Sequence, residues 1–274
     1  MSLGIAFKGP EGIVLAADSR VTLNAEMNDG KGLKLLPSTF DNATKLLRIN
    51  GQKHVGVVTY GLGVLGTPQP RTAHSFLPEF EDELFEADTP RLDVEEFAGK
   101  LSEFFLRQWN QFMPADFPKG EDMIFLVGGY DIGQPYGRLF QFAIPSNPNP
   151  VEQNSNDFGI VWGGQAQFTY RLLNGFDPQL PQMIKEHLSL TNLNTEELYN
   201  LLRSNLAVPI PYQFLPLQDC VDLSVLLIRM TIEIQSFCLG VRGVGGAIDV
   251  ATITRTNGFE AIQQKAIKGE RQRN

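Results

Sequence analysis

The first twenty residues, MSLGIAFKGPEGIVLAADSR, alternate apolar positions with small or polar ones before a turn. Leu3, Ile5 and Phe7 lie at every second position, which is typical of a strand with one buried face. Proline and glycine in GPEG favour a tight turn, and IVLAA has the composition of a buried return strand. The pattern predicts a hairpin in which Asp18 returns beside Ser2 or Leu3.

A second hairpin is predicted from TKLLRI and HVGVVTY, because Asn50-Gly51 between them is a strong turn signal. The segment between the two hairpins, residues 24–42, is rich in glycine, asparagine and charge. This composition predicts an inserted surface loop.

Helical periodicity follows in LDVEEFAGKLSEFFLRQWNQF, whose apolar residues recur at steps of three and four and form one stripe. A shorter helix is predicted around FLPEFEDELFE. Further strands are predicted in MIFLVGGYD, GRLFQFAIP and FGIVWGG, with an Asn/Pro-rich loop, SNPNPVEQNSND, before the last of them. Helices are predicted over residues 165–237, then a strand in GGAIDVATIT and a polar C-terminal tail, KAIKGERQRN.

This order of elements predicts an α+β layered fold, since strand-rich ends enclose helical pairs without strict β-α-β alternation. The sequence contains no internal repeat and no long linker. We therefore predict a single domain over residues 1–274.

Composition narrows the function classes. The chain has 274 residues and a formal net charge of −8, which disfavours binding to nucleic acid or to an anionic membrane surface. It starts without the charged and apolar regions of a signal peptide, and it has no apolar stretch long enough to cross a bilayer. The two cysteines, Cys220 and Cys238, are expected to be reduced thiols. These features predict a cytoplasmic protein.

The motif Gly61-Leu-Gly-Val-Leu-Gly66 matches the spacing of dinucleotide-binding loops. Pro68 and Pro70 follow it, however, and delay any helix beyond the point where a pyrophosphate would bind. The three histidines are isolated, and the sequence contains neither G-x-S-x-G nor H-E-x-x-H. We therefore predict no cofactor and no metal, and we do not expect a Ser-His-Asp hydrolase.

Ser2 is the candidate nucleophile. After removal of Met1 it would carry a hydroxyl group and a free α-amine, whose reference pKa of about 7.7–8.0 suits a general base. One residue then supplies both the attacking oxygen and the base. Lys45 and Asp18 are placed at strand ends near Ser2, where Lys45 favours the neutral amine and Asp18 orients Lys45. The glycine-rich turn at Gly61 can supply a backbone N–H for the oxyanion.

The sequence resembles the proteasome β-type family in the order GIVLAADSRVT, TKLLRI, TYGLG, LVGGYD and GVGGAIDVATIT, over most of the chain. The resemblance places Ser2 at the nucleophilic threonine and Asp18 at the invariant aspartate, with Arg20 at the adjacent arginine. Lys45 falls on the catalytic lysine and Gly61 on the oxyanion-hole glycine.

The resemblance implies a four-layer α/β/β/α sandwich of the N-terminal-nucleophile hydrolase type, with extra loops near 24–42 and 189–215. It also implies peptide-bond hydrolysis of a peptide or protein substrate inside a self-compartmentalised homo-oligomer, often with an ATP-dependent unfoldase. No propeptide precedes Ser2, as in HslV and the Anbu proteins.

Three positions depart from the family pattern. Gly164 stands where the family has a supporting serine, and Val241 and Val244 stand where it has an aspartate and a serine. A retained Met1 would block the site. Two alternatives therefore stay open: a catalytically silent scaffold subunit of a proteasome-like assembly, and an amidase or transpeptidase acting on one small substrate.

Overall fold

The computed structural model describes residues 2–28, 33–66, 69–86, 90–118 and 120–267. The chain divides into two compact units, Met1–Gly164 with Tyr212–Asn274, and Gln165–Pro211. Each is described by itself below, and the single-domain expectation stays a prediction.

The first sheet of the larger unit is five-stranded and antiparallel, with the strand order β12-β1-β2-β13-β14. The predicted first hairpin is confirmed, because Gly9 N donates to Gly12 O (2.9 Å) between β1 and β2. No strand is predicted from the sequence where β14 lies, and β14 continues the sheet beyond β13. The strands are β1 (Leu3–Lys8), β2 (Ile13–Asp18), β12 (Gly159–Gly164), β13 (Ile248–Thr254) and β14 (Gly258–Gln263).

The second sheet has five antiparallel strands in the order β11-β10-β9-β6-β5. The predicted second hairpin is confirmed as β5 and β6. The predicted Asn/Pro-rich loop is wrong in part, because residues 147–153 form β11. This is an edge strand, where proline removes no hydrogen bond that the sheet needs. The strands are β5 (Leu46–Arg48), β6 (Val55–Gly61), β9 (Met123–Gly129), β10 (Arg138–Ile144) and β11 (Asn147–Gln153).

An apolar cluster joins the two sheets. Its members come from β1, β2 and β13 on one side, and from β5, β6, β9, β10 and the residue directly after β9 on the other: Ala6, Ile13, Leu15, Ala17, Leu46, Val58, Tyr60, Leu126, Tyr130, Leu139, Ala251 and Ile253. Burial of this layer fixes the face of each strand, since a register slip by one residue would turn its apolar side chains to the other face.

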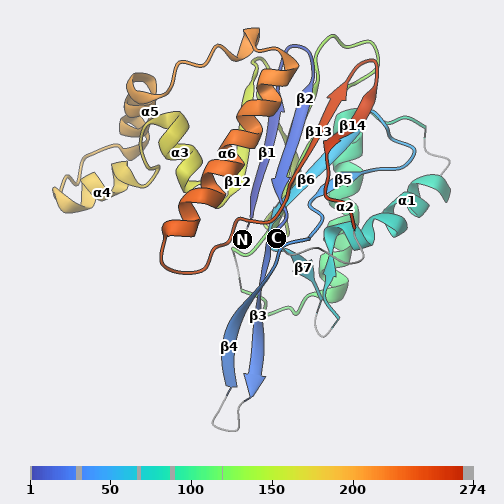
Figure 1. Ribbon diagram of the computed structural model, residues 1–274, viewed down its shortest axis with the longest axis horizontal. Coiled ribbons are helices and arrows are strands. Elements are labelled where there is room, and N and C mark those ends of the chain that lie inside the picture. The colour runs from blue at the N-terminus through green and yellow to red at the C-terminus, as the bar shows by residue number, and fades with distance from the viewer. Residues whose placement is uncertain (1, 29–32, 67–68, 87–89, 119, 268–274) are drawn as a thin grey trace, which may run out of the picture. The chain divides into compact units, whose positions relative to one another are not determined.

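Helices pack on both sheets. The predicted helices are confirmed as α1 (Leu77–Glu86) and α2 (Val94–Phe112), and α2 packs against β9, β10 and β11. Its start is fixed by a capping box of Asp93 and Glu96. Helix α6 (Leu217–Phe237) packs against β1, β2 and β13, as Figure 1 shows, and a short 3-10 turn, η2 (Tyr212–Phe214), precedes it.

Short elements lie near the end of the sheets where β1 begins. Residues 24–42 were predicted as a loop, but they contain most of a hairpin of β3 (Val21–Asn28) and β4 (Leu33–Phe40), which projects from the sheets in Figure 1. The smaller pair β7 (Val64–Leu65) and β8 (Arg71–Thr72) follows β6, and η1 (Ala73–Phe76) leads into α1.

The smaller unit is helical, as predicted for this part of the chain. It consists of α3 (Gln167–Asn174), α4 (Leu180–His187) and α5 (Thr195–Leu206). The expected loop near 189–215 therefore includes a helix, α5, which Asn194 caps by accepting from Glu196 N and Glu197 N. Of the C-terminal tail, residues 268–274 lie outside the described residues. No helix in the described ranges combines the length and apolarity needed to cross a bilayer.

Candidate active site

The first hairpin brings the start of the chain to the end of β2. Gly4 pairs with Ala17, so the next position outward places Asp18 beside Leu3. Leu3 N donates to Asp18 Oδ1 at 3.0 Å. The predicted position of Asp18, beside Ser2 or Leu3, is confirmed.

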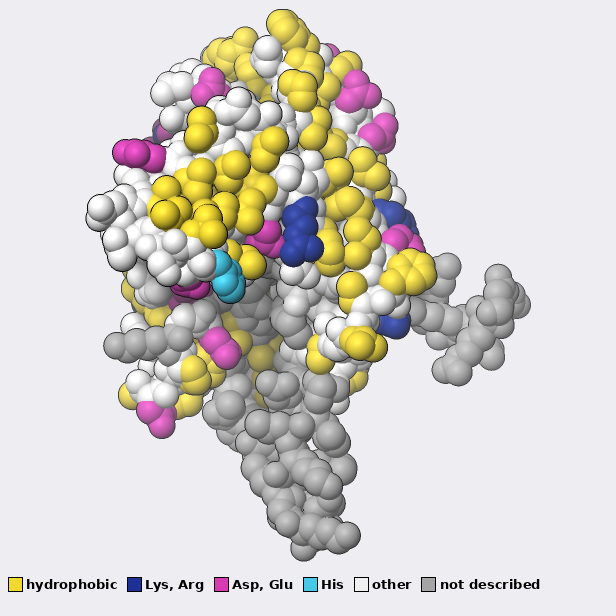
Figure 2. Space-filling view, turned by 90° about the vertical axis from the view of Figure 1, so that its left-hand side faces the viewer, with side chains coloured by type: hydrophobic (Ala, Val, Ile, Leu, Met, Phe, Trp, Pro, Cys, Tyr) yellow, Lys and Arg dark blue, Asp and Glu magenta, His cyan; other side chains and the backbone are white. Residues whose placement is uncertain are grey.

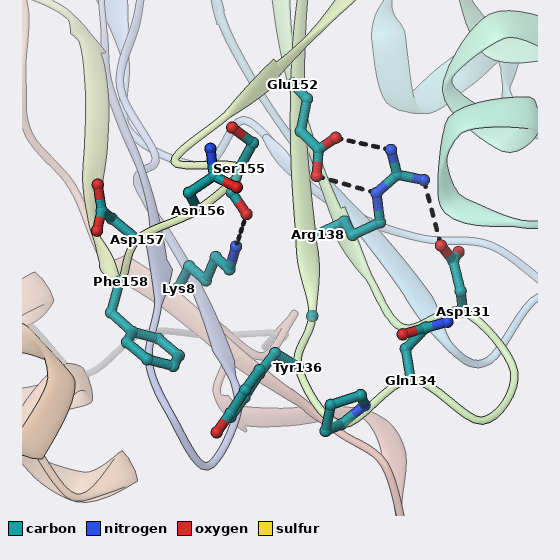
Figure 3. Close-up of a pocket in the computed structure, with 12 residues that line it drawn as sticks. Lys8, Asp131, Gln134, Tyr136, Arg138, Glu152, Ser155, Asn156, Asp157 and Phe158 are labelled. Carbon is teal, nitrogen blue, oxygen red and sulfur yellow. Dashed lines mark hydrogen bonds and ion pairs between the residues drawn. The ribbon is translucent and has the colours of Figure 1, made fainter.

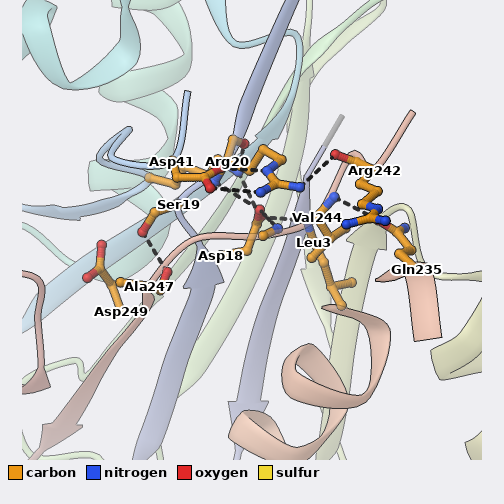
Figure 4. A network of polar contacts seen from close by, with 12 residues as sticks. Leu3, Asp18, Ser19, Arg20, Asp41, Gln235, Arg242, Val244, Ala247 and Asp249 are labelled. Carbon is orange, nitrogen blue, oxygen red and sulfur yellow. Dashed lines mark hydrogen bonds and ion pairs between the residues drawn. The ribbon is translucent and has the colours of Figure 1, made fainter. Parts of the chain in front are cut away.

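The carboxylate of Asp18 is fully buried and accepts four hydrogen bonds (Figure 4). Its Oδ2 accepts from Arg20 N at 3.1 Å and from Gly245 N at 3.0 Å. Its Oδ1 accepts from Leu3 N and, at 2.7 Å, from Lys45 Nζ. Three backbone donors therefore fix the carboxylate, and the charged group that donates to it is the ammonium group of Lys45.

Lys45 lies directly before β5 and is 6% exposed. Its Nζ donates to Asp18 Oδ1 and, at 2.5 Å, to Arg20 O. Burial lowers the pKa of Lys45, the charge and hydrogen bond of Asp18 oppose this effect, and the charges of Lys265 and Arg20 add to it. The ammonium group of Lys45 therefore loses its proton more easily than that of an exposed lysine.

Ser2 and Gly61 line the same pocket as Lys45, together with Thr59. Ser2 is 4% exposed. Gly61 has a φ of +84°, and a Cβ there would lie 2.3 Å from Asp122 O, so no other residue fits. The structure therefore brings all four predicted site residues together, because Asp18 contacts Lys45 directly and the other three share this pocket.

Arg20 forms a second layer around Asp18. Its guanidinium binds Asp41 through two hydrogen bonds of 2.5 and 2.7 Å and donates to Arg242 O at 3.2 Å. The hydrogen bond from Arg20 lowers the pKa of Asp41. A Cβ at Gly245 would lie 2.5 Å from Arg20 Cζ, which explains one glycine of the GVGG segment. Asp41 was missed because it lies in the segment predicted as a loop.

The backbone at Gly164 gives a reason why this position does not carry the serine expected from the resemblance. It pairs with Leu3 and has a φ of +95°, and a Cβ there would lie 1.9 Å from Ser2 O. A serine cannot occupy this conformation without displacing Ser2. Of the other two departures, Val244 is buried and donates its N–H to Gln235 Oε1 at 3.0 Å, whereas Val241 is 45% exposed.

Two further features were missed or only partly foreseen from the sequence. Thr59 lines the pocket beside Ser2. Asp249, in the apolar strand IDVATIT, is 1% exposed and is paired with Lys265. An acidic residue inside an apolar run was the available signal, because such a residue is normally buried with a partner. The Gly61–Gly66 segment contains β7, where a dinucleotide-binding loop would begin a helix.

The chain matches no protein-family model, and no curated protein matches it significantly. Its structure is similar to three structures of Anbu proteins. One is an Anbu (Gly-1) mutant from Hyphomicrobium sp. strain MC1, with a TM-score of 0.54 and 15% identity over 97% of this chain and 87% of that one. The second, Anbu (ancestral beta-subunit) from Yersinia bercovieri, has a TM-score of 0.53 and 15% identity over 96% and 88%.

The third is the helical assembly of the Anbu complex from Pseudomonas aeruginosa, with a TM-score of 0.56 and 16% identity over 98% of this chain and 88% of that one. The similarity extends over nearly the whole chain. At this level of identity it establishes a common fold with these proteins, at a coarse level.

Proposed function

We propose that the protein is a peptide-bond hydrolase with an N-terminal serine nucleophile, built on the four-layer α/β/β/α sandwich of that hydrolase class. The observation that carries the proposal is the buried ion pair of Lys45 and Asp18, because Lys45 also lines the pocket of Ser2. A charged pair is expensive to bury and is retained where it has a specific task.

In the proposed reaction, Met1 has been removed and the α-amine of Ser2 accepts the proton of its own hydroxyl group. The Ser2 oxygen attacks the carbonyl carbon of the scissile peptide bond, and the Gly61 N–H stabilises the oxyanion. The C–N bond then breaks, the amine returns the proton to the leaving nitrogen, and an ester forms on Ser2. Water activated by the same amine hydrolyses this ester.

Lys45 acts on the amine through its charge. A nearby cation disfavours the protonated form of the Ser2 amine and keeps it available as a base near neutral pH. Asp18 fixes the position of that cation, since it binds Lys45 Nζ at 2.7 Å while three backbone N–H groups hold its own oxygens. In this proposal Asp18 positions Lys45, Lys45 keeps the Ser2 amine unprotonated, and the amine takes the proton of the Ser2 hydroxyl group.

We also propose that the chain works as a homo-oligomer that encloses the site. The smaller unit exposes seven large apolar side chains, which contact with another copy of the chain would remove from water. They are Leu172, Met183, Leu188, Leu190, Leu201, Leu206 and Val208. Figure 2 shows hydrophobic side chains spread over the face that it views, with acidic and basic side chains between them. One Anbu structure is described as a helical assembly. A cytoplasmic location and an ATP-dependent unfoldase belong to the same proposal.

A catalytically silent scaffold subunit is the second candidate. The observation that favours it is the loss of side chains at supporting positions, since Gly164 has none and Val241 and Val244 offer no polar group. The fold and the Lys45–Asp18 pair would then serve stability alone.

The test is covalent labelling of the assembled protein with an epoxyketone, whose ring closure uses both the hydroxyl group and the α-amine of Ser2. Intact mass should first show loss of Met1. Lys45→Met should slow labelling by about 10²–10⁴-fold, the typical effect of losing support for proton transfer. Lys8→Met is the matched control, because Lys8 is an equally buried lysine at the opposite end of β1. It should label at the wild-type rate.

Wild-type protein without Met1 that takes up no epoxyketone would refute the peptidase proposal and favour the scaffold. Equal labelling of the wild type and Lys45→Met would refute the role of Lys45.

A further inference from the structure

A second buried acid–base pair lies next to the candidate site. Asp249 is on β13 opposite Ala17, and its neighbour Ile248 is opposite Asp18. The Asp249 carboxylate is 1% exposed, and both of its oxygens contact one residue, Lys265. Lys265 N donates to Oδ1 at 2.9 Å, and Lys265 Nζ pairs with Oδ2.

The chain after β14 carries Lys265 to this position. Gln263 pairs with Val250, and its Nε2 donates to Ile248 O at 2.7 Å. The segment therefore follows β13 toward the end of the sheet where Asp18 lies. The Lys265 side chain is only 14% exposed there, so its charge acts at short range in a poorly solvated environment.

The charged groups around Lys45 come from four places in the chain. Asp18 attracts its ammonium group, and Asp41 lies near enough for Lys45 to lower the pKa of that carboxyl. Arg20 and Lys265 repel it. Each repelling cation is held by its own carboxylate, Arg20 by Asp41 and Lys265 by Asp249.

We propose that Lys265, held by Asp249, is a positioning residue of the candidate site that keeps Lys45 directed onto Asp18. The inference rests on the proposed function, which gives the position of Lys45 its purpose. Without Lys265, Asp249 would be a buried carboxylate with no cation, which is a costly arrangement. Because β13 contacts β5, which starts directly after Lys45, we expect Lys45 to turn toward an unpaired Asp249 and away from Asp18 and Ser2.

The experiment measures the pKa of Lys45 in the full chain, from the pH titration of ¹³Cε-labelled lysine followed by NMR. The Lys45 signal is assigned by its loss in Lys45→Arg. Lys265→Met should raise the pKa of Lys45 by about one pH unit, since a repelling charge is lost and an attracting one is freed. Lys265→Arg should restore the wild-type value, and Lys8→Met should leave it unchanged.

The double variant Asp249→Asn/Lys265→Met guards against a fold that fails around the unpaired carboxylate. It removes both charges of the pair, so Lys45 loses the repulsion of Lys265 without gaining the attraction of an unpaired Asp249, and its pKa should lie between those of the wild type and Lys265→Met. A Lys45 pKa equal to the wild-type value in both folded Lys265→Met and the folded double variant would overturn the proposal. The titration needs no enzymatic activity, so an inert wild type would refute the proposed function and leave this inference standing.

Discussion

The two ends of β1 each hold a nearly buried lysine, and only one of them belongs to the candidate site. Lys45 and Lys8 are 6% and 5% exposed, and burial lowers the pKa of both. Lys45 donates to the Asp18 carboxylate, whereas Lys8 donates to two backbone carbonyls, Asn154 O at 2.6 Å and Ser155 O at 3.1 Å. Burial and a shifted pKa alone therefore do not distinguish a functional lysine from a structural one.

The two ends of β1 differ in which basic residue, arginine or lysine, pairs with the carboxylates nearby. At the Lys8 end, Arg138 binds Glu152 at 2.7 Å and contacts Asp131, as Figure 3 shows. It also contacts Glu95. Lys8 is left with carbonyl oxygens and ties β1 to the chain that follows β11. At the Ser2 end, Arg20 binds Asp41, and this leaves Asp18 to Lys45.

The largest expected effect is that of Asp18→Asn. This change leaves the buried Lys45 ammonium without its counter-charge, and breaking a buried pair in this way costs about 3–5 kcal/mol of unfolding free energy. Denaturant unfolding measures the loss. Asp131→Asn at the other end is the control and should cost about 1 kcal/mol, because its Arg138 partner keeps Glu152 and Glu95. Equal losses in the two variants would mean that the two ends do not differ as described.

A smaller but still large effect is expected from Gly164→Ser, which introduces the serine that the resemblance predicted at this position. The positive φ alone costs on the order of 1–3 kcal/mol for a residue with a Cβ, and the contact with Ser2 O must also be relieved. Epoxyketone labelling should fall together with stability, because Ser2 must move.

Gly159→Ala at the opposite end of β12 is the matched control for this change. A Cβ there meets the Asn154 side chain at 3.2 Å rather than a backbone atom, and that side chain can shift. Its unfolding free energy should stay within about 1 kcal/mol of the wild type. A stable, fully reactive Gly164→Ser protein would contradict the account of Gly164.

The first hairpin shows how much of the site could be predicted from the sequence. Period-two alternation and a Gly-Pro turn were enough to place Asp18 beside Ser2 or Leu3, and the second hairpin placed Lys45 at a strand start. These are local signals, in which a few neighbouring residues determine the geometry. The antiparallel sheets and the helices α1 and α2 followed from patterns of the same kind.

The parts that were missed depend on residues far apart in the chain. Lys265 reaches Asp249 only because β14 folds back along β13, and no local pattern encodes that contact. Asp41 finds Arg20 across the β3–β4 hairpin, whose charged and glycine-rich composition predicted a loop. Strand β11 was hidden by its prolines, which an edge strand tolerates.

The smallest expected effect on stability concerns the two arginine–carboxylate pairs, Arg138–Glu152 and Arg20–Asp41. The two ends of β1 are alike in having such a pair. The hydrogen bond from Arg138 lowers the pKa of Glu152 below its usual 4.5, and Arg20 does the same for Asp41. A carboxyl whose pKa is lower in the folded state stabilises the fold above its unfolded pKa, and this contribution is lost as the pH falls through the folded value. Glu152→Gln should therefore be less stable than the wild type at pH 6, and the difference should shrink as the pH falls toward 3. Because solvent screens the partly exposed pair, the difference at pH 6 should be about 0.5 kcal/mol.

Asp41→Asn should show the same dependence with a smaller amplitude, since the Asp41 side chain is 43% exposed against 26% for Glu152. Denaturant unfolding at the two pH values measures both. A much larger amplitude for Asp41→Asn would mean that the Arg20 pair takes part in holding Lys45 and is more than an outer support.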